Sequence, residues 1–245
     1  MHLCGLGFEA EVGLEAWMQD VAVSLPPAAL TSRLGKVRLR LERDVIEDGR
    51  LAVSETATNA LRYGRAPGDR PPTAPELWIW ARTVPSAQLV VSLFGCARIS
   101  YPHASGAGLL DEYSKGLGLL GEFTAEWGSA PSRSRLAERA VLGKTVWFAL
   151  PLPGTWPGLG HRVHPGTAAQ CLLLALMKRG FPGTLSSDDR GISVLELPGL
   201  NVWVHRKNFC WRDGPSSCVR RPLIDLQETA EHLVRDLLGS PARTS

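Results

Sequence analysis

Hydrophobic and polar positions follow two different periods along this chain, and the change between them predicts the order of its elements. Over residues 44–62 apolar side chains recur every three or four positions, which is the period of an amphipathic helix. Asp44 has the character of an N-cap, and Gly64 falls where a helix C-cap is expected. A weaker helical pattern covers residues 9–24, and an amphipathic one covers residues 28–43.

The pattern then changes to that of strands. Runs of β-branched and aromatic residues at 77–81 and 89–93 are joined by a short Pro-Ser turn and predict a hairpin. A third strand is expected at 146–150, and a short helix from about 118 to 126. The polar, Arg- and Ser-rich segment 128–143 is expected to be an irregular excursion. Helices followed by antiparallel strands predict an α+β fold, a two-layer sandwich with helices over one face of a sheet.

A Pro/Gly-rich stretch at 151–160, PLPGTWPGLG, predicts a boundary between two units. The first unit spans 1–152, and the second, 161–240, is a small α+β module of unknown function. The pattern of this module is αββα, with a helix at 165–180, strands at 192–197 and 201–211 around a Pro198-Gly199 turn, and a helix at 225–238. Trp203, Phe209 and Trp211 alternate along the second of these strands and are expected to line its buried face.

Composition excludes several classes of protein. A net charge of +3 is small for a nucleic-acid reader. A mild basic patch near the aromatic strand could serve single-stranded nucleic acid, but neighbouring acids favour a solvated strand face; its members are Arg206, Lys207, Arg212, Arg220 and Arg221. No apolar run is long enough to span a bilayer, and the first residues lack a signal-peptide pattern. The five cysteines are scattered without a CxxC pair, as expected of free thiols in the cytoplasm.

Candidate chemistry is concentrated in the helical phrase LAVSETATNALRYG at 51–64. Glu55 and Asn59 lie one turn apart on one face of this helix. An amide oxygen can bind Mg²⁺, and a carboxylate one turn earlier can orient a hydroxyl or water toward a phosphate. Arg62, nearly one turn further, could meet a phosphate or pair with an acid. The same spacing also suits a solvated helix face, so the spacing alone does not distinguish a nucleotide site from such a face.

Two further phrases are typical of phosphate-binding backbone, although each is common in other contexts. Gly116 and Gly118 precede the short expected helix, so their N–H groups could approach phosphates while Lys115 screens the charge. Gly143-Lys-Thr145 leads into the third strand, but the GxxxxGK[ST] pattern of a P-loop is absent.

Taken together, the phrases LAVSETATNALRYG, KGLGLL and GKTVWFAL resemble the GHKL (Bergerat-fold) ATPases, in particular the anti-sigma regulatory factor serine-kinase branch abundant in actinobacteria. The resemblance covers about residues 28–152. It implies that ATP and Mg²⁺ bind between the helical layer and a lid, with Glu55 as general base and Asn59 as the Mg²⁺ ligand. The resemblance also implies that five further residues lie near the phosphates or the base of ATP: Lys115, Gly116, Gly118, Leu119 and Thr145.

In that family the phosphoryl group passes to a serine or threonine of a regulatory protein, such as an anti-sigma antagonist, and the kinase can bind a sigma factor. A homodimer is possible, whereas a membrane or a nucleic acid is not an expected partner. The chain departs from the family at Gly95, which stands where the family has an adenine-binding Asp. Two functions therefore remain open: a serine/threonine kinase, and a catalytically degenerate relative that acts only by binding proteins.

Overall fold

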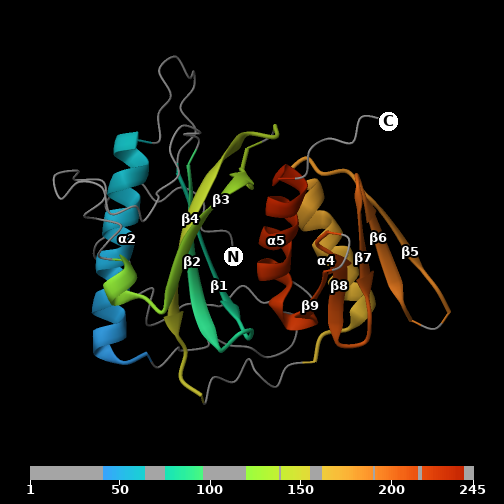
Figure 1. Ribbon diagram of the computed structural model, residues 1–245, viewed down its shortest axis with the longest axis horizontal. Helices are drawn as coiled ribbons and strands as arrows, with labels where there is room; N and C mark the ends of the chain where they lie inside the picture. The colour runs from blue at the N-terminus through green and yellow to red at the C-terminus, as the bar shows by residue number, and fades with distance from the viewer. Residues whose placement is uncertain are drawn as a thin grey trace.

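The computed structural model describes the chain in seven segments, residues 41–63, 75–95, 120–137, 139–154, 162–189, 191–214 and 217–239. Within them the protein is an α+β structure with helices and two antiparallel sheets. Figure 1 shows these elements as layers, with helix α2, the first sheet, the helices α5 and α4, and the second sheet following one another across the molecule.

Helix α2, Arg43–Tyr63, confirms the helix expected at 44–62. Asp44 lies in its first turn, where a carboxylate interacts favourably with the helix dipole. The helix packs across strands β2 and β4 of the first sheet. Ala52 and Thr56 are buried there, and the Thr56 hydroxyl donates to the Ala52 carbonyl oxygen at 2.8 Å, so this buried hydroxyl is satisfied.

The first sheet has the strand order β1-β2-β4-β3, and every neighbouring pair is antiparallel. Its strands are β1 (Glu76–Arg82), β2 (Gln88–Gly95), β3 (Glu126–Arg133) and β4 (Leu142–Pro151). The hairpin expected from the two runs at 77–81 and 89–93 is confirmed, with Ile79 opposite Val91. The strand expected at 146–150 is also confirmed, as part of β4.

The irregular excursion expected at 128–143 is corrected at both ends, because residues 128–133 lie in β3 and residues 142–143 begin β4, while the described residues of 134–141 form no helix or strand. The polar residues of β3 suit a strand because they meet partners from the second half of the chain: the Arg133 guanidinium lies 4.0 Å from the centre of the Phe181 ring. The expected helix at 118–126 is wrong in extent, since helical residues end at 123 and Glu126 already belongs to β3.

The second sheet is a meander of five strands, ordered β5-β6-β7-β8-β9, flanked by two helices and a 3₁₀ turn. Its elements are α4 (Pro165–Met177), β5 (Thr184–Ser187), β6 (Ser193–Leu197), β7 (Leu200–Val204), β8 (Asn208–Arg212), β9 (Cys218–Pro222), η3 (Leu223–Asp225) and α5 (Leu226–Gly239). The expected αββα pattern therefore has the right helices but too few strands.

The strand expected at 201–211 is divided into the hairpin β7–β8, whose turn is closed by the His205 N–H donating to the Asn208 carbonyl oxygen at 2.9 Å. The interruption changes the alternation of side chains. Phe209 and Trp211 are fully buried, whereas Trp203 is only half-buried and lies on the other face of the sheet. The turn expected at Pro198-Gly199 is confirmed, with Gly199 at φ +79°, where glycine is unstrained.

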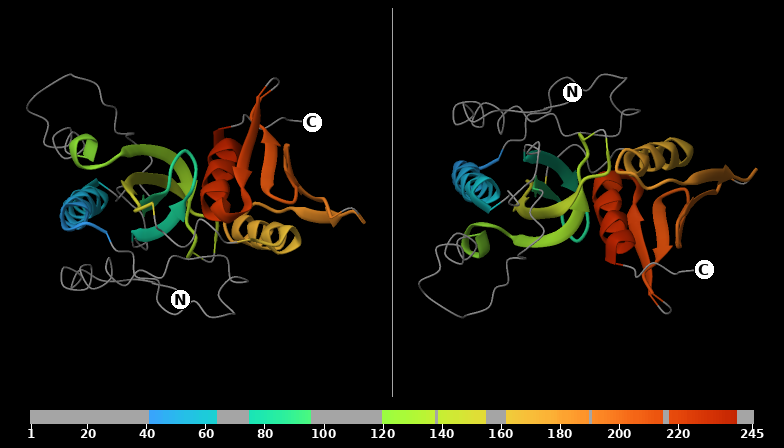
Figure 2. Two further views of the ribbon diagram at one scale, coloured as in Figure 1. Left: turned by 90° about the horizontal axis from the view of Figure 1, so that it is seen from below. Right: turned by 90° about the horizontal axis from the view of Figure 1, so that it is seen from above.

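Both faces of the first sheet are covered, which corrects the expectation of helices on one face. Beneath α2, Leu89, Phe148 and Leu150 form a core with Ala52. On the opposite face the apolar residues Trp80, Val90 and Ala149 are buried, and helix α5 lies over β3 and β1. Figure 2 shows α5 between the two sheets from two further directions. The first sheet and the second-half core thus share one helix.

Candidate functional site

Two of the three predicted motif phrases, those on α2 and at the start of β4, meet at the corner of the first sheet nearest the end of β2. Gly95 ends β2 and is directly opposite Lys144 of β4. A Cβ atom placed on Gly95 would lie 4.0 Å from the Cβ atom of Ala60, which belongs to the last turns of α2. The end of β2, the start of β4 and the second half of α2 therefore meet.

The residues predicted on α2 are arranged as one helix requires. Glu55 is half-buried, and Asn59 and Arg62 follow it within the same helix, with side chains outside the described part of the chain. The glycine-rich phrase, with Lys115, Gly116, Gly118 and Leu119, also lies outside the described residues. These positions stay predictions.

Thr145 lies on the face of the sheet that is turned away from α2. Its hydroxyl is 2.5 Å from the Ser92 hydroxyl and 3.4 Å from the Leu93 carbonyl oxygen. Val146 and Phe148 point toward the α2 core, so by alternation Lys144 shares their face and Thr145 does not. The structure thus does not bring the side chains of Thr145 and Glu55 together.

Lys144 is the residue at this corner that sequence reasoning missed. It is half-buried, and burial lowers the pKa of its ammonium group from the usual value. An ammonium group on this face can neutralise phosphate oxygens near α2. The strand alternation in GKTVWFAL could have identified it, had the inward positions Val146 and Phe148 been used to choose the face.

Gly143 has a structural reason to be glycine. A Cβ atom at this position would lie 2.3 Å from the Gly95 carbonyl oxygen and 2.7 Å from the Phe94 ring. The start of β4 approaches the end of β2 too closely for any side chain. The glycine of the GKT phrase is therefore explained by packing, without a phosphate.

The densest cluster of charged side chains lies on the other face, where α5 meets the sheet. The Arg82 guanidinium is almost fully buried and donates to Glu228 at 3.1 Å, to Glu126 at 2.5 Å and to the Gln88 side chain at 2.7 Å. The Trp80 indole N–H donates to the other oxygen of Glu228 at 2.9 Å.

Burial opposes ionisation of Glu228, but the nearby His232 and Arg82 and the Trp80 hydrogen bond outweigh it and lower its pKa to about 2. Glu228 is therefore a carboxylate at neutral pH, held by two donors on strand β1. This is a docking contact between α5 and the first sheet.

Two more carboxylates, Glu231 of α5 and Asp225 of η3, bind the first half of the chain. Glu231 is paired with both Arg135 and Arg179, and the Arg135 guanidinium also lies 4.3 Å from the centre of the Trp78 ring. Asp225 accepts hydrogen bonds from the backbone N–H groups of Thr83, at 2.8 Å, and Val84, at 3.2 Å. Apart from the buried Arg179 Nη1, which has no hydrogen-bond partner among the described residues, these groups pair with one another, as expected of a structural cluster.

Burial has opposite consequences for two groups of this cluster. Burial raises the pKa of Asp225 to about 6, because its effect is larger than that of the hydrogen bonds from Thr83, which favour the carboxylate. It lowers the pKa of Arg135 to about 9, against the attraction of Glu231.

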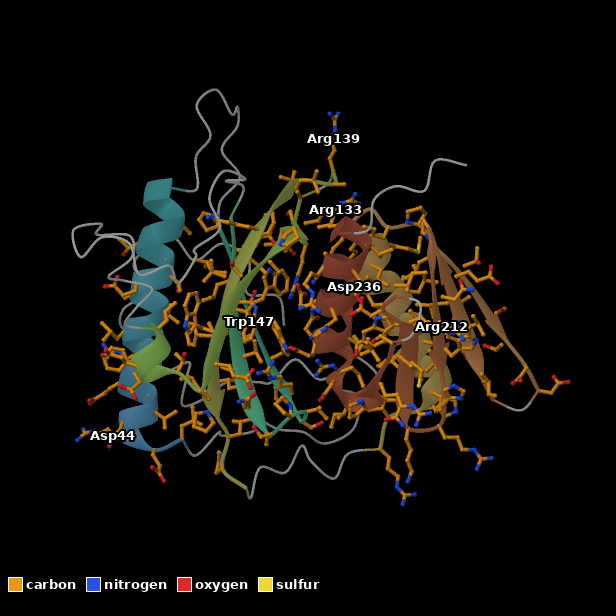
Figure 3. The ribbon with its side chains drawn as sticks, viewed as in Figure 1. Asp44, Arg133, Arg139, Trp147, Arg212 and Asp236 are labelled. Carbon is orange, nitrogen blue, oxygen red and sulfur yellow. The ribbon has the colours of Figure 1, made fainter. Side chains whose placement is uncertain are left out.

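The first sheet also contacts the residues that follow α4. Arg133 of β3, in the upper part of Figure 3, donates to the carbonyl oxygens of Arg179 and Gly180, at 3.2 and 2.9 Å.

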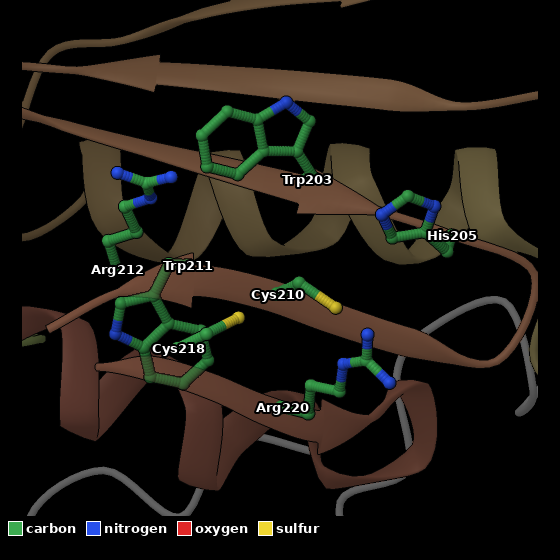
Figure 4. A pocket seen from close by; sticks show the side chains of 7 residues that line it. All are labelled: Trp203, His205, Cys210, Trp211, Arg212, Cys218 and Arg220. Carbon is green, nitrogen blue, oxygen red and sulfur yellow. The ribbon is translucent and has the colours of Figure 1, made fainter. Parts of the chain in front are cut away.

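A shallow hollow of about 270 Å³ lies on the second sheet, among Trp203, His205, Cys210, Trp211, Arg212, Cys218 and Arg220. Figure 4 shows Arg212 and His205 on opposite sides of the Trp203 ring.

The described part of the chain contains no candidate metal site: no group of three or more His, Cys, Asp or Glu residues there is arranged to hold a metal ion. No helix among the described residues has the length and apolar character needed to cross a membrane.

The chain has no match among protein-family models, curated proteins or solved structures. What it does is therefore argued from the geometry of its own residues.

Proposed function

We propose that this chain is an ATP-binding regulatory protein in which α2 and the first sheet form a Bergerat-type sandwich. The observation that supports this most directly is the meeting of Gly95, Lys144 and the second half of α2 at one corner of the sheet. Two of the three motif phrases that resemble the GHKL ATPases converge there. We further propose that the protein transfers a phosphoryl group from ATP to a serine or threonine of a regulatory protein.

Each residue of this corner has a definite task in the proposal. Asn59 gives its amide oxygen to Mg²⁺, and Glu55 accepts the proton of the attacking hydroxyl. Lys144, and not Thr145, is the residue of the GKT phrase that we assign to the phosphates, because it lies on the α2 face. Phosphoryl transfer requires mainly positioning and neutralisation of charge, which a metal ion and an ammonium group supply.

A second function is favoured by Gly95, which offers no carboxylate to the adenine amino group. Loss of a hydrogen bond to a charged group costs about 1.5–3 kcal/mol, or roughly ten- to a hundredfold in affinity. On this alternative the protein keeps the fold, does not turn over ATP, and acts by binding a partner such as an anti-sigma antagonist or a sigma factor.

Titration calorimetry of the full chain with Mg²⁺-ATP tests for the ATP site on which the kinase function depends. The kinase proposal predicts micromolar binding that Asn59→Ala abolishes and that Ser54→Ala, an exposed position on the same helix, leaves within about twofold. No heat and no thermal shift at millimolar ATP would rule out the ATP site and leave the binding function.

Gly95→Asp adds a test of where the adenine lies. Among the described residues the Cβ atom meets only Ala60, at an ordinary contact distance, so these neighbours leave room for a side chain there. If the adenine ring lies beside β2, the new carboxylate should raise ATP affinity by roughly tenfold or more. An unchanged affinity in a variant that binds ATP would place the base elsewhere.

A further inference from the structure

The outer face of the second sheet carries an aromatic ring and two guanidinium groups across three neighbouring strands. Trp203 of β7 is directly opposite Cys210 of β8, which in turn is opposite Arg220 of β9. Arg212 follows on β8, opposite Cys218. The inner face of the same strands is buried against the helices, so this row lies on the face that the described helices leave uncovered.

The hollow over this row has a lining with basic and aromatic character. Its lining residues contain no carboxylate, and both Arg212 and Arg220 are exposed. Burial raises the pKa of the Cys210 thiol, although Arg220 opposes this, so the thiol stays neutral near pH 7. A negatively charged ligand therefore meets no negative charge within the hollow.

Basic residues continue along β8 beyond the hollow. Arg206 and Lys207 are exposed in the β7–β8 turn, and Arg212 is exposed at the far end of the strand. From Arg206 to Arg212 the strand spans roughly 20 Å. The exposed acids Glu196 and Asp213 border this track without interrupting it.

We propose that this outer face binds a short stretch of single-stranded nucleic acid, with a base stacked on the Trp203 ring and phosphates paired with Arg212 and Arg220. A flat ring on a sheet, flanked by guanidinium groups, suits unpaired bases, whose faces are free to stack. A solvated strand face, expected from the sequence, needs no indole at its centre, whereas here the half-buried Trp203 ring lies on the outer face and lines the hollow. The β7–β8 turn supplies this ring by turning Trp203 to the outer side.

Fluorescence anisotropy of the full chain with labelled oligo(dT) of 12 nucleotides and the matching oligo(rU) tests this proposal. We expect binding that weakens by about 50-fold between 50 and 200 mM salt, as about four phosphate contacts predict. Arg212→Ala/Arg220→Ala should weaken binding by at least tenfold and reduce the salt slope by about 1.4. The matched control Arg139→Ala/Arg162→Ala removes the same charge from exposed positions elsewhere and should change affinity less than twofold (Figure 3 shows Arg139 far from Arg212).

Stacking is tested separately from charge. Trp203→Leu should weaken binding by about fivefold or more, whereas Trp203→Phe, which keeps a ring, should retain most of it. Thermal melts of both variants show whether they are folded. A duplex of the same length should bind more weakly than the single strand.

Several results would overturn the proposal. One is equal loss in the two arginine double variants, which would indicate attraction to net charge alone. Another is full affinity in a folded Trp203→Leu variant. Displacement of the oligonucleotide by polyglutamate at equal charge would identify the face as a site for acidic peptides, and absence of binding at 50 mM salt would remove the site altogether.

Discussion

Glu228 shows how a single residue joins the two halves of this chain. Its two carboxylate oxygens accept from Arg82 and Trp80, which lie on one strand of the first sheet, while its own backbone belongs to α5. A buried carboxylate is stable only when donors replace its lost water. The position therefore tolerates neither an apolar side chain nor the removal of Arg82.

The free energy of unfolding at acidic pH tests whether Glu228 is a buried carboxylate. Its pKa is lowered from 4.5 to about 2 in the folded protein, so its contribution is present above pH 4.5 and is lost as the pH falls toward 2. Glu228→Gln should cost about 2–3 kcal/mol at pH 5.5. Between pH 5.5 and 3.5 the difference between the two proteins should shrink by about 1 kcal/mol.

Urea unfolding of both proteins at several pH values measures that difference. Asp225, whose pKa is raised to about 6, changes stability in the opposite direction over pH 4–6, but it is present in both proteins and largely cancels. A difference that stays constant down to pH 3.5 would mean that Glu228 is not held as a low-pKa carboxylate.

Gly143 gives a second test at this scale. Gly143→Ala places a methyl group against the Gly95 carbonyl oxygen and the Phe94 ring, where the nearest contact is 2.3 Å. We expect a loss of about 1–3 kcal/mol in the free energy of unfolding, because strands β2 and β4 must move apart. Gly154→Ala is the matched control, since a Cβ atom there meets none of the described residues within 4 Å. Equal effects in thermal denaturation would contradict the close approach.

At the scale of elements, local patterns predict what local interactions decide. Helix α2 and the β1–β2 hairpin follow from periodicity because each has one apolar face and clear end signals. Strand β3 does not, because its residues are polar and become a strand only by pairing with β4 and meeting α5. Polar side chains such as Glu126 and Arg133 pair with residues far along the chain, which no local window contains.

The candidate site follows the same rule. The face of Lys144 could be derived from strand alternation, and the four-residue spacing of Glu55 and Asn59 needs only a helix. That Gly95 lies beside Ala60 requires the packing of α2 on the sheet, which the sequence does not show. That Trp203 lies on the face opposite to Phe209 and Trp211 likewise depends on the turn after Val204, because a single interruption exchanges the two faces of a strand.

At the scale of the whole molecule, α5 packs on both halves of the chain, with a different set of residues facing each half. Leu233 and Val234 belong to the core of the second half, whereas Glu228 and Glu231 pair with residues of the first half. Without α5, the apolar face around Trp80 would be exposed to water. We therefore expect the two halves to unfold together, although the sequence divides them at a Pro/Gly-rich stretch.

Hydrogen exchange measured by mass spectrometry tests this cooperativity. Leu233→Ala removes a fully buried side chain from the second-half core and should cost about 2–5 kcal/mol. If the protein unfolds as one unit, the slowest amides of β2 and of β7 should lose protection by the same amount. Leu174→Ala, on an exposed position of α4, should change neither. Loss of protection in β7 alone would show that α5 stabilises only its own half, and that the first sheet keeps its structure without it.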